Sequence, residues 1–236
     1  MKLSVLIPVF NEVETIAAIV ERVQAVPLDL EIILVNDASS DGTAVVLGRL
    51  PTTNLKIIHH PVNRGKGAAI RTALEAATGD VIVIQDADSE YDPQDLVQLI
   101  APLRQGTADV VYGVRSLASQ KLLMHFGNWF VTFVTNWLYG QHLKDMETCY
   151  KMMGRMIALS LDLECRRFDV EAEITAKLVR VGYTIHELPI SYTARYENKK
   201  LSPLDGLPTL RALWKFRGWK PAAPARIPMK DAKQLV

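Results

Sequence analysis

The chain has 236 residues, of which 49% are hydrophobic, two cysteines and a formal net charge of +1. This length and apolar content are enough to bury a sizeable core, which excludes a disordered or a small disulfide-stapled chain. The length predicts one large domain, or one domain plus an appendage. Cys149 and Cys165 are too few and too unpatterned for a disulfide framework or a four-ligand zinc site, so we expect a reducing compartment, by default the cytoplasm.

The first half of the chain alternates apolar runs with helical periodicities. Nearly continuous β-branched and aliphatic runs are typical of strands that are buried on both faces. Three such runs cover residues 3–10, 31–36 and 80–85, and residues 55–59 form a further strand. Helical periods lie between them, at 15–26, 43–50 and 67–78. This order predicts an α/β fold with a mostly parallel sheet flanked by helices.

The second half begins with a strand at 109–113, followed by an aromatic and apolar stretch over 117–139. Polar residues interrupt that stretch at helical spacing and should line one face: His125, Asn128, Thr132, Thr135 and Asn136. A membrane-spanning helix needs about 20 mostly apolar residues. Because this stretch is marginal in length and carries a polar stripe, we expect one or two amphipathic interfacial helices and no transmembrane span. The alternative is a buried helix hairpin.

The last third is expected to contain a helix at 168–182, a strand at 183–192, a basic helix at 204–217 and a flexible end. Residues 195–236 carry ten basic against three acidic side chains, close to Trp214, Phe216 and Trp219. Cations and aromatic side chains together favour an anionic membrane surface. A solvated tail is the alternative, and no nucleic-acid recognition motif accompanies the charge.

Acidic side chains spaced by two follow the strand at 80–85, namely Asp86, Asp88 and Glu90. A hard divalent cation binds several oxygen ligands, and alternate positions at a strand end can turn two or three carboxyls toward one point. This spacing indicates a Mg²⁺ or Mn²⁺ site. Alternatively the acids cap the following helix, for which Asp92 before Pro93 is a typical start.

Two further polar clusters follow predicted strands. Asp37 comes directly after the strand at 31–36 and could accept hydrogen bonds from a base or a ribose, whereas residues 41–43 are typical of a turn with a helix cap. Residues 63–67 place two glycines and Lys66 at a helix start, where backbone N–H groups and a cation suit phosphate. The spacing is not that of a P-loop.

Taken together, these segments resemble the family-2 inverting glycosyltransferases with the GT-A fold, especially the polyprenyl-phosphate sugar transferases of the dolichol-phosphate mannose synthase group. The resemblance covers nearly the whole chain and rests on motifs that occur in the family's order. They lie at 5–12, around Asp37, at 63–67, 86–88, 111–116, 145–151 and 188–190, with Arg195 and Lys200 beyond.

The resemblance implies transfer of a sugar from a nucleotide-diphosphate sugar (GDP-mannose or a UDP-hexose) to a polyprenyl phosphate, with Mg²⁺ or Mn²⁺, at the cytoplasmic face of a membrane. It also implies one domain over 1–218, with a donor half at 1–115 and an acceptor half at 116–218, and a tail at 219–236. A glycan hydroxyl is the alternative acceptor. A nucleotidyltransferase is a distant alternative, because the glycine-rich signature of that class is missing at the first strand. A non-catalytic nucleotide-sugar-binding protein is another, and the presence of Asp86, Asp88 and Arg115 argues against it.

The resemblance also assigns roles to single residues. Nucleotide-sugar binding is expected from Pro8, Asn11, Glu12, Asp37, Lys66, Asp86, Arg195 and Lys200. The metal would be bound by Asp86, Asp88 and Glu90, the last standing where the family often has glutamine. Acceptor binding is expected from Arg115, Lys121 and His125. Asp145 or Glu147 would act as general base toward a hydroxyl, whereas a phosphate needs positioning by Arg115 more than deprotonation.

Overall fold

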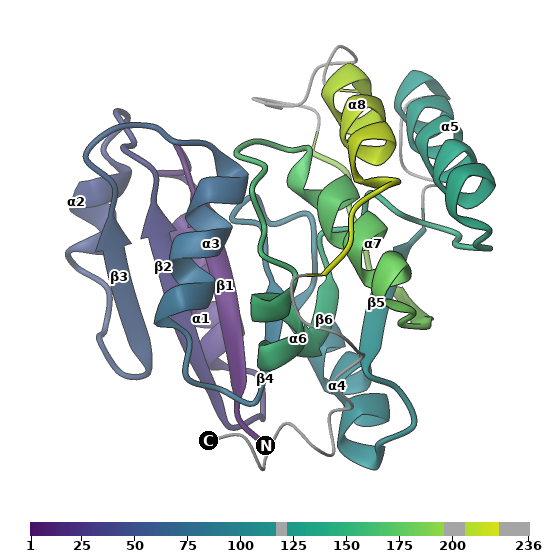
Figure 1. Cartoon of the computed structure of the whole chain (residues 1–236). Coiled ribbons are helices and arrows are strands. Elements are labelled where there is room, and N and C mark those ends of the chain that lie inside the picture. The colour runs from purple at the N-terminus through teal and green to yellow at the C-terminus, as the bar shows by residue number, and fades with distance from the viewer. Residues whose placement is uncertain (117–121, 196–205, 222–236) are drawn as a thin grey trace.

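The computed structural model describes residues 1–116, 122–195 and 206–221. The strands form one sheet in the order β3-β2-β1-β4-β6-β5-β7 (Figure 1). Their bounds are β1 Leu3–Val9, β2 Leu30–Asn36, β3 Leu55–His59, β4 Val81–Ile84, β5 Val110–Arg115, β6 Lys151–Gly154 and β7 Ile185–Ile190. All neighbouring strands run parallel except β6, which is antiparallel to both β4 and β5. The predicted α/β class with a mostly parallel sheet is confirmed.

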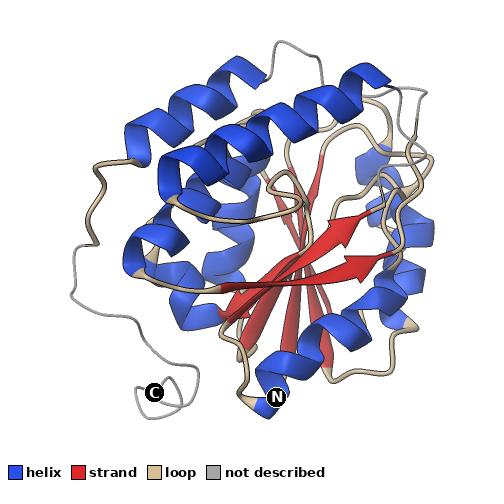
Figure 2. Ribbon diagram, turned by 90° about the vertical axis from the view of Figure 1, so that its right-hand side faces the viewer, coloured by secondary structure: helices blue, strands red, loops and turns tan. Residues whose placement is uncertain are grey.

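Helices cover both faces of the sheet (Figure 2). They are α1 Ile16–Gln24, α2 Thr43–Leu47, α3 Lys66–Ala76, α4 Leu96–Gln105, α5 Leu122–Tyr139, α6 Arg155–Ser160, α7 Val170–Val181 and α8 Gly206–Phe216, with a 3₁₀ turn η1 at Pro93–Asp95. In α1, the spacing of Ile16, Ile19, Val20 and Val23 places all four on one face, which is buried against the core. The Asp92 side chain accepts a hydrogen bond from the Gln94 amide, so the expected helix cap is present at this position.

The short strand β6 was not predicted from the sequence, and its direction determines where the site forms. Parallel strands end at one edge of a sheet, so the segments after β1, β2 and β4 meet there. Because β6 runs the opposite way, the segment that leads into it, residues 145–150, lies at the same edge. In register, Val83 of β4 pairs with Met152 and Tyr112 of β5 pairs with Lys151.

Helix α5 is a single amphipathic helix that packs beside α7 and α8 (Figure 1). Part of its polar stripe faces the protein: Thr132 accepts a hydrogen bond from the Met146 amide at 3.2 Å, and the Asn136 side chain bonds both backbone groups of Leu143, whereas His125 is exposed. Large aromatic side chains point outward, namely Phe126, Trp129, Phe130, Phe133 and Trp137. None of the helices described here is both long and apolar enough to cross a membrane.

The basic C-terminal helix differs in part from the expectation. Trp214 is exposed, but Phe216 is buried in the core, so it is not an interfacial aromatic residue. Trp219 also packs against the core and lies 5.0 Å from the ammonium of Lys177, so the chain is still ordered where a flexible tail was expected to begin. Residues 222–236 of that tail lie outside the described residues.

Candidate active site

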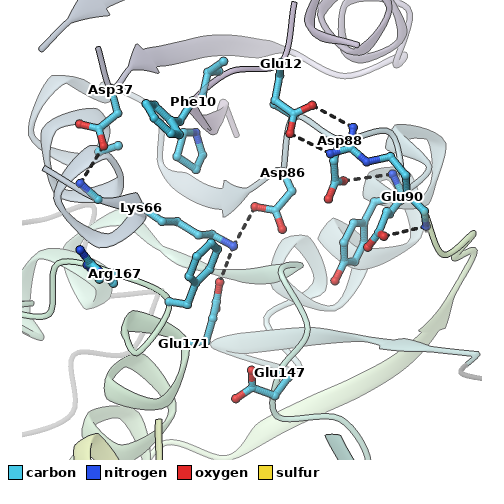
Figure 3. Close-up of a pocket in the computed structure, with 18 of the residues that line it drawn as sticks. Phe10, Glu12, Asp37, Lys66, Asp86, Asp88, Glu90, Glu147, Arg167 and Glu171 are labelled. Atoms are coloured by element: carbon cyan, nitrogen blue, oxygen red, sulfur yellow. Dashed lines mark hydrogen bonds and ion pairs between the residues drawn. The ribbon is translucent and has the colours of Figure 1, made fainter. Parts of the chain in front are cut away.

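A cavity of about 380 Å³ opens at the sheet edge where the strand ends meet (Figure 3). Its lining comes from both halves of the chain: Pro8, Val9, Phe10, Glu12, Asp37, Asn63, Gly65, Lys66, Ala69, Asp86, Ala87, Asp88, Glu90, Tyr91, Arg115, Asn128, Glu147, Arg167, Phe168, Glu171, Tyr192 and Arg195. The structure therefore brings together most of the residues expected to bind a nucleotide sugar. Asn11 is not among them, because its side-chain oxygen accepts a hydrogen bond from the Ser40 amide instead.

Asp37 is buried at the cavity wall and holds the loop that follows β3. Its carboxylate accepts hydrogen bonds from the amides of Arg64 and Gly65 at 2.9 and 2.7 Å, and it lies 2.6 Å from Nδ1 of His60. The other ring nitrogen of His60 contacts the Thr72 hydroxyl. Sequence reasoning missed His60, because a lone histidine after a strand carries no recognisable spacing.

The glycines of the 63–67 loop allow close backbone packing rather than an open phosphate cradle. A Cβ at Gly65, where φ is +92°, would lie 2.2 Å from the Arg166 carbonyl, and one at Gly67 would lie 2.4 Å from the Cys165 carbonyl. The amides of Gly67 and Ala68 donate to the Arg166 carbonyl. The expectation that amides at this helix start bind phosphate is therefore wrong for these two groups.

Lys66 reaches into the cavity between two carboxylates. Its Nζ lies 2.7 Å from Asp86 Oδ1 and 3.0 Å from Glu171 Oε1 (Figure 3). Burial alone would lower the pKa of Lys66, but Asp86 and Glu171 outweigh it and hold that pKa well above its usual value. Glu171 continues the chain of charges to Lys151, whose Nζ is 3.4 Å away and fully buried.

The acids after β4 do not form the expected three-carboxylate metal site. Glu90 accepts hydrogen bonds from the Tyr192 hydroxyl and the Arg195 amide, so its carboxylate holds the segment after β7. Within the residues that the structure describes, no three His, Cys, Asp or Glu side chains are arranged to hold a metal ion. Asp86 and Asp88 are left as a pair that lines the cavity.

The electrostatics of the cavity fit a divalent cation bound by that pair together with a ligand. Among the residues that the structure describes, four basic side chains and seven carboxyls line it. Burial, with the nearby charges of Asp86 and Glu90, raises the pKa of Asp88 to about 7. An excess of carboxyl charge repels a diphosphate unless a cation is present, and Mg²⁺ is often bound by only one or two carboxylates plus phosphate oxygens.

Arg115 and Asp145 form a buried two-point ion pair. Nε and Nη2 of Arg115 donate to the two Asp145 oxygens at 2.7 and 2.8 Å, and the guanidinium lies 5.3 Å from the Tyr192 ring. Asp145 is only 2% exposed and does not line the cavity, whereas Arg115 does. The structure thus gives Asp145 the geometry of a residue that orients Arg115.

Glu147 differs from Asp145 in both position and pairing. It lines the cavity, and its buried Oε1 has no hydrogen-bond partner in the described part of the chain. Burial raises the pKa of Glu147 to about 7, despite the opposing charge of Lys151. A buried acceptor without a partner is costly, and a carboxyl that titrates near neutrality can exchange a proton with a bound group.

The expected acceptor-binding residues are only partly placed by the structure. Lys121 lies outside the described residues, as does Lys200 of the donor set. His125 is exposed on α5 and does not line the cavity. Asn128, one turn further along the same helix, does line it.

Comparison with known proteins identifies the family. Residues 4–159, about two thirds of the chain, match the protein family described as "Glycosyl transferase family 2". The chain belongs to this family. It is therefore a glycosyltransferase, as its motifs indicated.

This glycosyltransferase is 30% identical over 202 residues to a low-salt glycan biosynthesis hexosyltransferase of Haloferax volcanii, an alignment that covers 82% of this chain and 48% of that protein. It thus spans about half the length of that relative. It is 26% identical over 209 residues to the undecaprenyl-phosphate mannosyltransferase of Micrococcus luteus, with 83% and 85% covered. It is 25% identical over 233 residues to the polyprenol monophosphomannose synthase of Mycolicibacterium smegmatis, with 91% and 85% covered.

Among solved structures, this glycosyltransferase is similar to glucosyl-3-phosphoglycerate synthase of Mycobacterium tuberculosis in complex with Mn²⁺, UDP and phosphoglyceric acid. The TM-score is 0.74 at 20% sequence identity, and 97% of this chain and 90% of that chain are covered. The likeness confirms the predicted GT-A nucleotide-sugar transferase fold.

Several lining residues of this glycosyltransferase carried no signal in its sequence. Glu171 is an acid in the first turn of α7, where acids commonly stabilise the helix start, and only its position opposite Lys66 shows another use. Arg167 and Phe168 line the cavity from the loop before α7. Tyr192 does so from the segment after β7.

Proposed function

We propose that this glycosyltransferase moves a sugar from a nucleotide-diphosphate sugar to a polyprenyl phosphate, with inversion at the sugar, at the cytoplasmic face of a membrane. Residues 1–115 would supply most of the donor and metal site and residues 116–218 most of the acceptor site, in one domain over 1–218. Arg115 and Arg195 would be the exceptions, since each would bind the substrate of the other half. The relatives named for undecaprenyl-phosphate and polyprenol substrates support this acceptor class.

The observation that carries the proposal is the two-faced character of α5. Asn128 lines the cavity from this helix, while the neighbouring Trp129 is 53% exposed and Trp137 is 73% exposed. Exposed aromatic side chains on an amphipathic helix favour the membrane interface. A lipid acceptor lying along this helix could therefore place its phosphate in the cavity without leaving the membrane surface.

Within the cavity, Arg115 would position the acceptor phosphate. A guanidinium has five N–H donors, and the pair with Asp145 uses two of them. The phosphate is already an anion at neutral pH, so positioning and charge compensation contribute more than deprotonation. Arg195 would bind the donor diphosphate, for which its planar fork is suited.

Asp86 and Asp88 would hold Mg²⁺ or Mn²⁺. When bound, this cation would neutralise the charge that develops on the leaving nucleoside diphosphate. The excess of carboxyls over basic side chains among the described residues that line the cavity supports this assignment.

A second candidate is transfer to a hydroxyl of a lipid-linked or soluble glycan. Glu147 favours it, because a buried carboxyl with a pKa of about 7 and an unpartnered oxygen suits a general base. Glu147, rather than Asp145, would then accept the proton of the attacking hydroxyl, since both oxygens of Asp145 are bonded to Arg115.

The test is a transfer assay with purified protein and Mn²⁺ or Mg²⁺. Radiolabelled UDP-glucose, GDP-mannose and UDP-N-acetylglucosamine are each offered with undecaprenyl phosphate. We expect a labelled product that extracts into organic solvent with one of these donors, and loss of that product in Asp88→Asn. Metal-dependent donor hydrolysis without any extractable product would contradict the phosphate acceptor and favour the hydroxyl.

A further inference from the structure

Glu171 is a buried carboxylate that lies between two ammonium groups. Its Oε1 is 3.0 Å from Lys66 Nζ and its Oε2 is 3.4 Å from Lys151 Nζ. Only 5% of its side chain is exposed, and neither oxygen has a hydrogen-bond partner among the residues that the structure describes. Its two contacts are therefore ionic, and they join the cavity to the inside of the protein.

Lys66 is shared between two carboxylates that line the cavity, one partly exposed and one almost fully buried. Asp86 has 25% of its side chain exposed, Lys66 has 12% and Glu171 has 5%. An ammonium as buried as this one must keep a carboxylate partner, because an unpaired charge in that environment is very unfavourable. Lys66 can therefore leave Asp86 only if Glu171 is ready to hold it.

We infer that Glu171 is a positioning residue that takes over Lys66 when the donor and its cation occupy Asp86. The inference rests on the cation that we propose at Asp86 and Asp88. In the structure the ammonium lies 2.7 Å from Asp86 Oδ1, so ammonium and cation would compete for the same oxygen. Glu171 provides the second place for the ammonium, and Asp86 becomes available to the cation without loss of the ion pair.

The other arm of the network keeps Glu171 itself in place. Lys151 also donates to the carbonyls of Met146 and Thr148, at 2.6 and 2.8 Å. Burial already lowers the pKa of Lys151 although Glu171 is charged. In Glu171→Gln, Lys151 can therefore be neutral and still donate to both carbonyls, so this variant should fold. Lys66 is therefore the ammonium that changes partners between Asp86 and Glu171, while Lys151 stays in place.

The experiment measures the affinity of the full chain for UDP and for GDP, each with Mn²⁺, by calorimetry. We expect Glu171→Gln to weaken the Mn²⁺-dependent binding about tenfold, a size typical for residues that support metal ligands. Lys66→Met should tighten it, because the competing ammonium is gone. In the Lys66→Met background, Glu171→Gln should cause no further loss. Glu75→Gln, at an exposed position of α3, is the matched control for the charge change.

The outcomes separate this inference from the proposed function. Unchanged Mn²⁺-dependent binding in Glu171→Gln, or an equal loss in both backgrounds, would overturn the exchange. If Glu171→Gln fails to show a folded melting transition, Lys66→Met decides alone, and weaker binding in that variant overturns the exchange. If the affinity of the wild type for UDP and GDP does not depend on Mn²⁺, both the proposed cation and the exchange are refuted. A failed transfer to undecaprenyl phosphate leaves this binding experiment unaffected.

Discussion

Glu12 and Arg195 lie 183 positions apart and form a two-point ion pair beside the cavity, with Nη1–Oε2 at 2.9 Å and Nη2–Oε1 at 3.0 Å. Glu12 follows β1, an interior strand of the sheet, and Arg195 follows β7, the strand at one end, so the pair joins an interior strand of the sheet's site edge to its β7 end. A carboxylate and a phosphate offer a guanidinium the same two-point geometry. Glu12 therefore holds Arg195 in an orientation that suits an incoming phosphate.

Arg195→Lys should raise KM for the donor about tenfold or more. The charge is kept, but the planar fork is lost, and one charge-assisted hydrogen bond contributes about 1.5–3 kcal/mol. The measurement is KM for the sugar nucleotide that is found active. Arg22→Lys serves as the control, since Arg22 also pairs with a carboxylate, Asp92, but lies outside the cavity lining. Equal KM values for Arg195→Lys and wild type would contradict the role of the fork.

Asp145→Asn should destabilise the protein by about 3 kcal/mol, because it breaks a buried ion pair and leaves the Arg115 charge without its counter-charge. Urea unfolding monitored by circular dichroism measures this change. Transfer should fall as well, since Arg115 loses its orientation. A variant with wild-type stability and no activity would show instead that Asp145 takes part directly in the chemistry.

Glu147→Gln should stabilise the protein at alkaline pH. The folded protein keeps the Glu147 proton up to about pH 7, whereas an unfolded chain releases it near the ordinary value of 4.5. Stability of the wild type therefore falls as pH rises from about 4.5 to 7. Relative to wild type, the variant should gain up to about 3 kcal/mol above pH 7 and nothing below pH 4.

The same variant tests the two acceptor classes. With a phosphate acceptor, Glu147→Gln should keep most of the transfer activity, because no proton has to be removed. With a hydroxyl acceptor, kcat should fall by the 10²–10⁴-fold typical of a lost general base. For the stability prediction above, a pH–stability profile of Glu147→Gln that runs parallel to the wild-type profile would contradict the raised pKa of Glu147.

Replacing Trp129 and Trp137 together by alanine should release the protein from vesicles that contain anionic lipid. Both side chains are more than half exposed, so the fold should survive and the melting temperature should hardly change. Co-sedimentation with phosphatidylglycerol vesicles measures the effect. Val97→Ala is the control, because Val97 is an exposed apolar residue on α4. If the double variant still sediments with vesicles, α5 is not the membrane contact.

Glu31→Gln should lower stability at neutral pH without affecting the cavity. Although partial burial acts to raise the pKa of Glu31, hydrogen bonds from Lys2, Ser4 and Thr78 lower it to about 2. Such a group stabilises the fold above the ordinary pKa of 4.5, and this contribution is lost as pH falls toward 2. We expect a loss of about 1–2 kcal/mol at pH 7, reduced for solvent screening, that disappears near pH 2. A constant difference across this range in urea unfolding would refute the linkage.

The sequence predicts the parallel part of the fold well, because the strands and helices there are identified by patterns among neighbouring residues. The strands at 3–9 and 30–36 are nearly continuous aliphatic runs, and α1 repeats its apolar residues with the helical period. Thr132 and Asn136 of the polar stripe of α5 share one face, as their spacing predicts, and both bond to residues 143–146. In each case neighbouring residues determine which face is buried.

What the sequence does not show depends on partners that are distant along the chain. Strand β6 has only four residues, and these form a strand because they pair with β4 and β5. Glu90 has the spacing of a metal ligand, but Tyr192, 102 positions later, occupies its carboxylate. Glu171 meets Lys66 only because α7 packs across the site, and no local pattern encodes that distance.

The hydrogen bond from Met146 to Thr132 fixes the rotational phase of α5. Each residue advances an α-helix by about 100°. A single-residue insertion between Trp129 and Thr132 would therefore rotate the aromatic face by roughly that angle relative to the segment that carries Glu147. Helix length at this point is thus constrained as tightly as residue identity, so that among relatives with this architecture insertions should gather at the ends of the helix rather than within it.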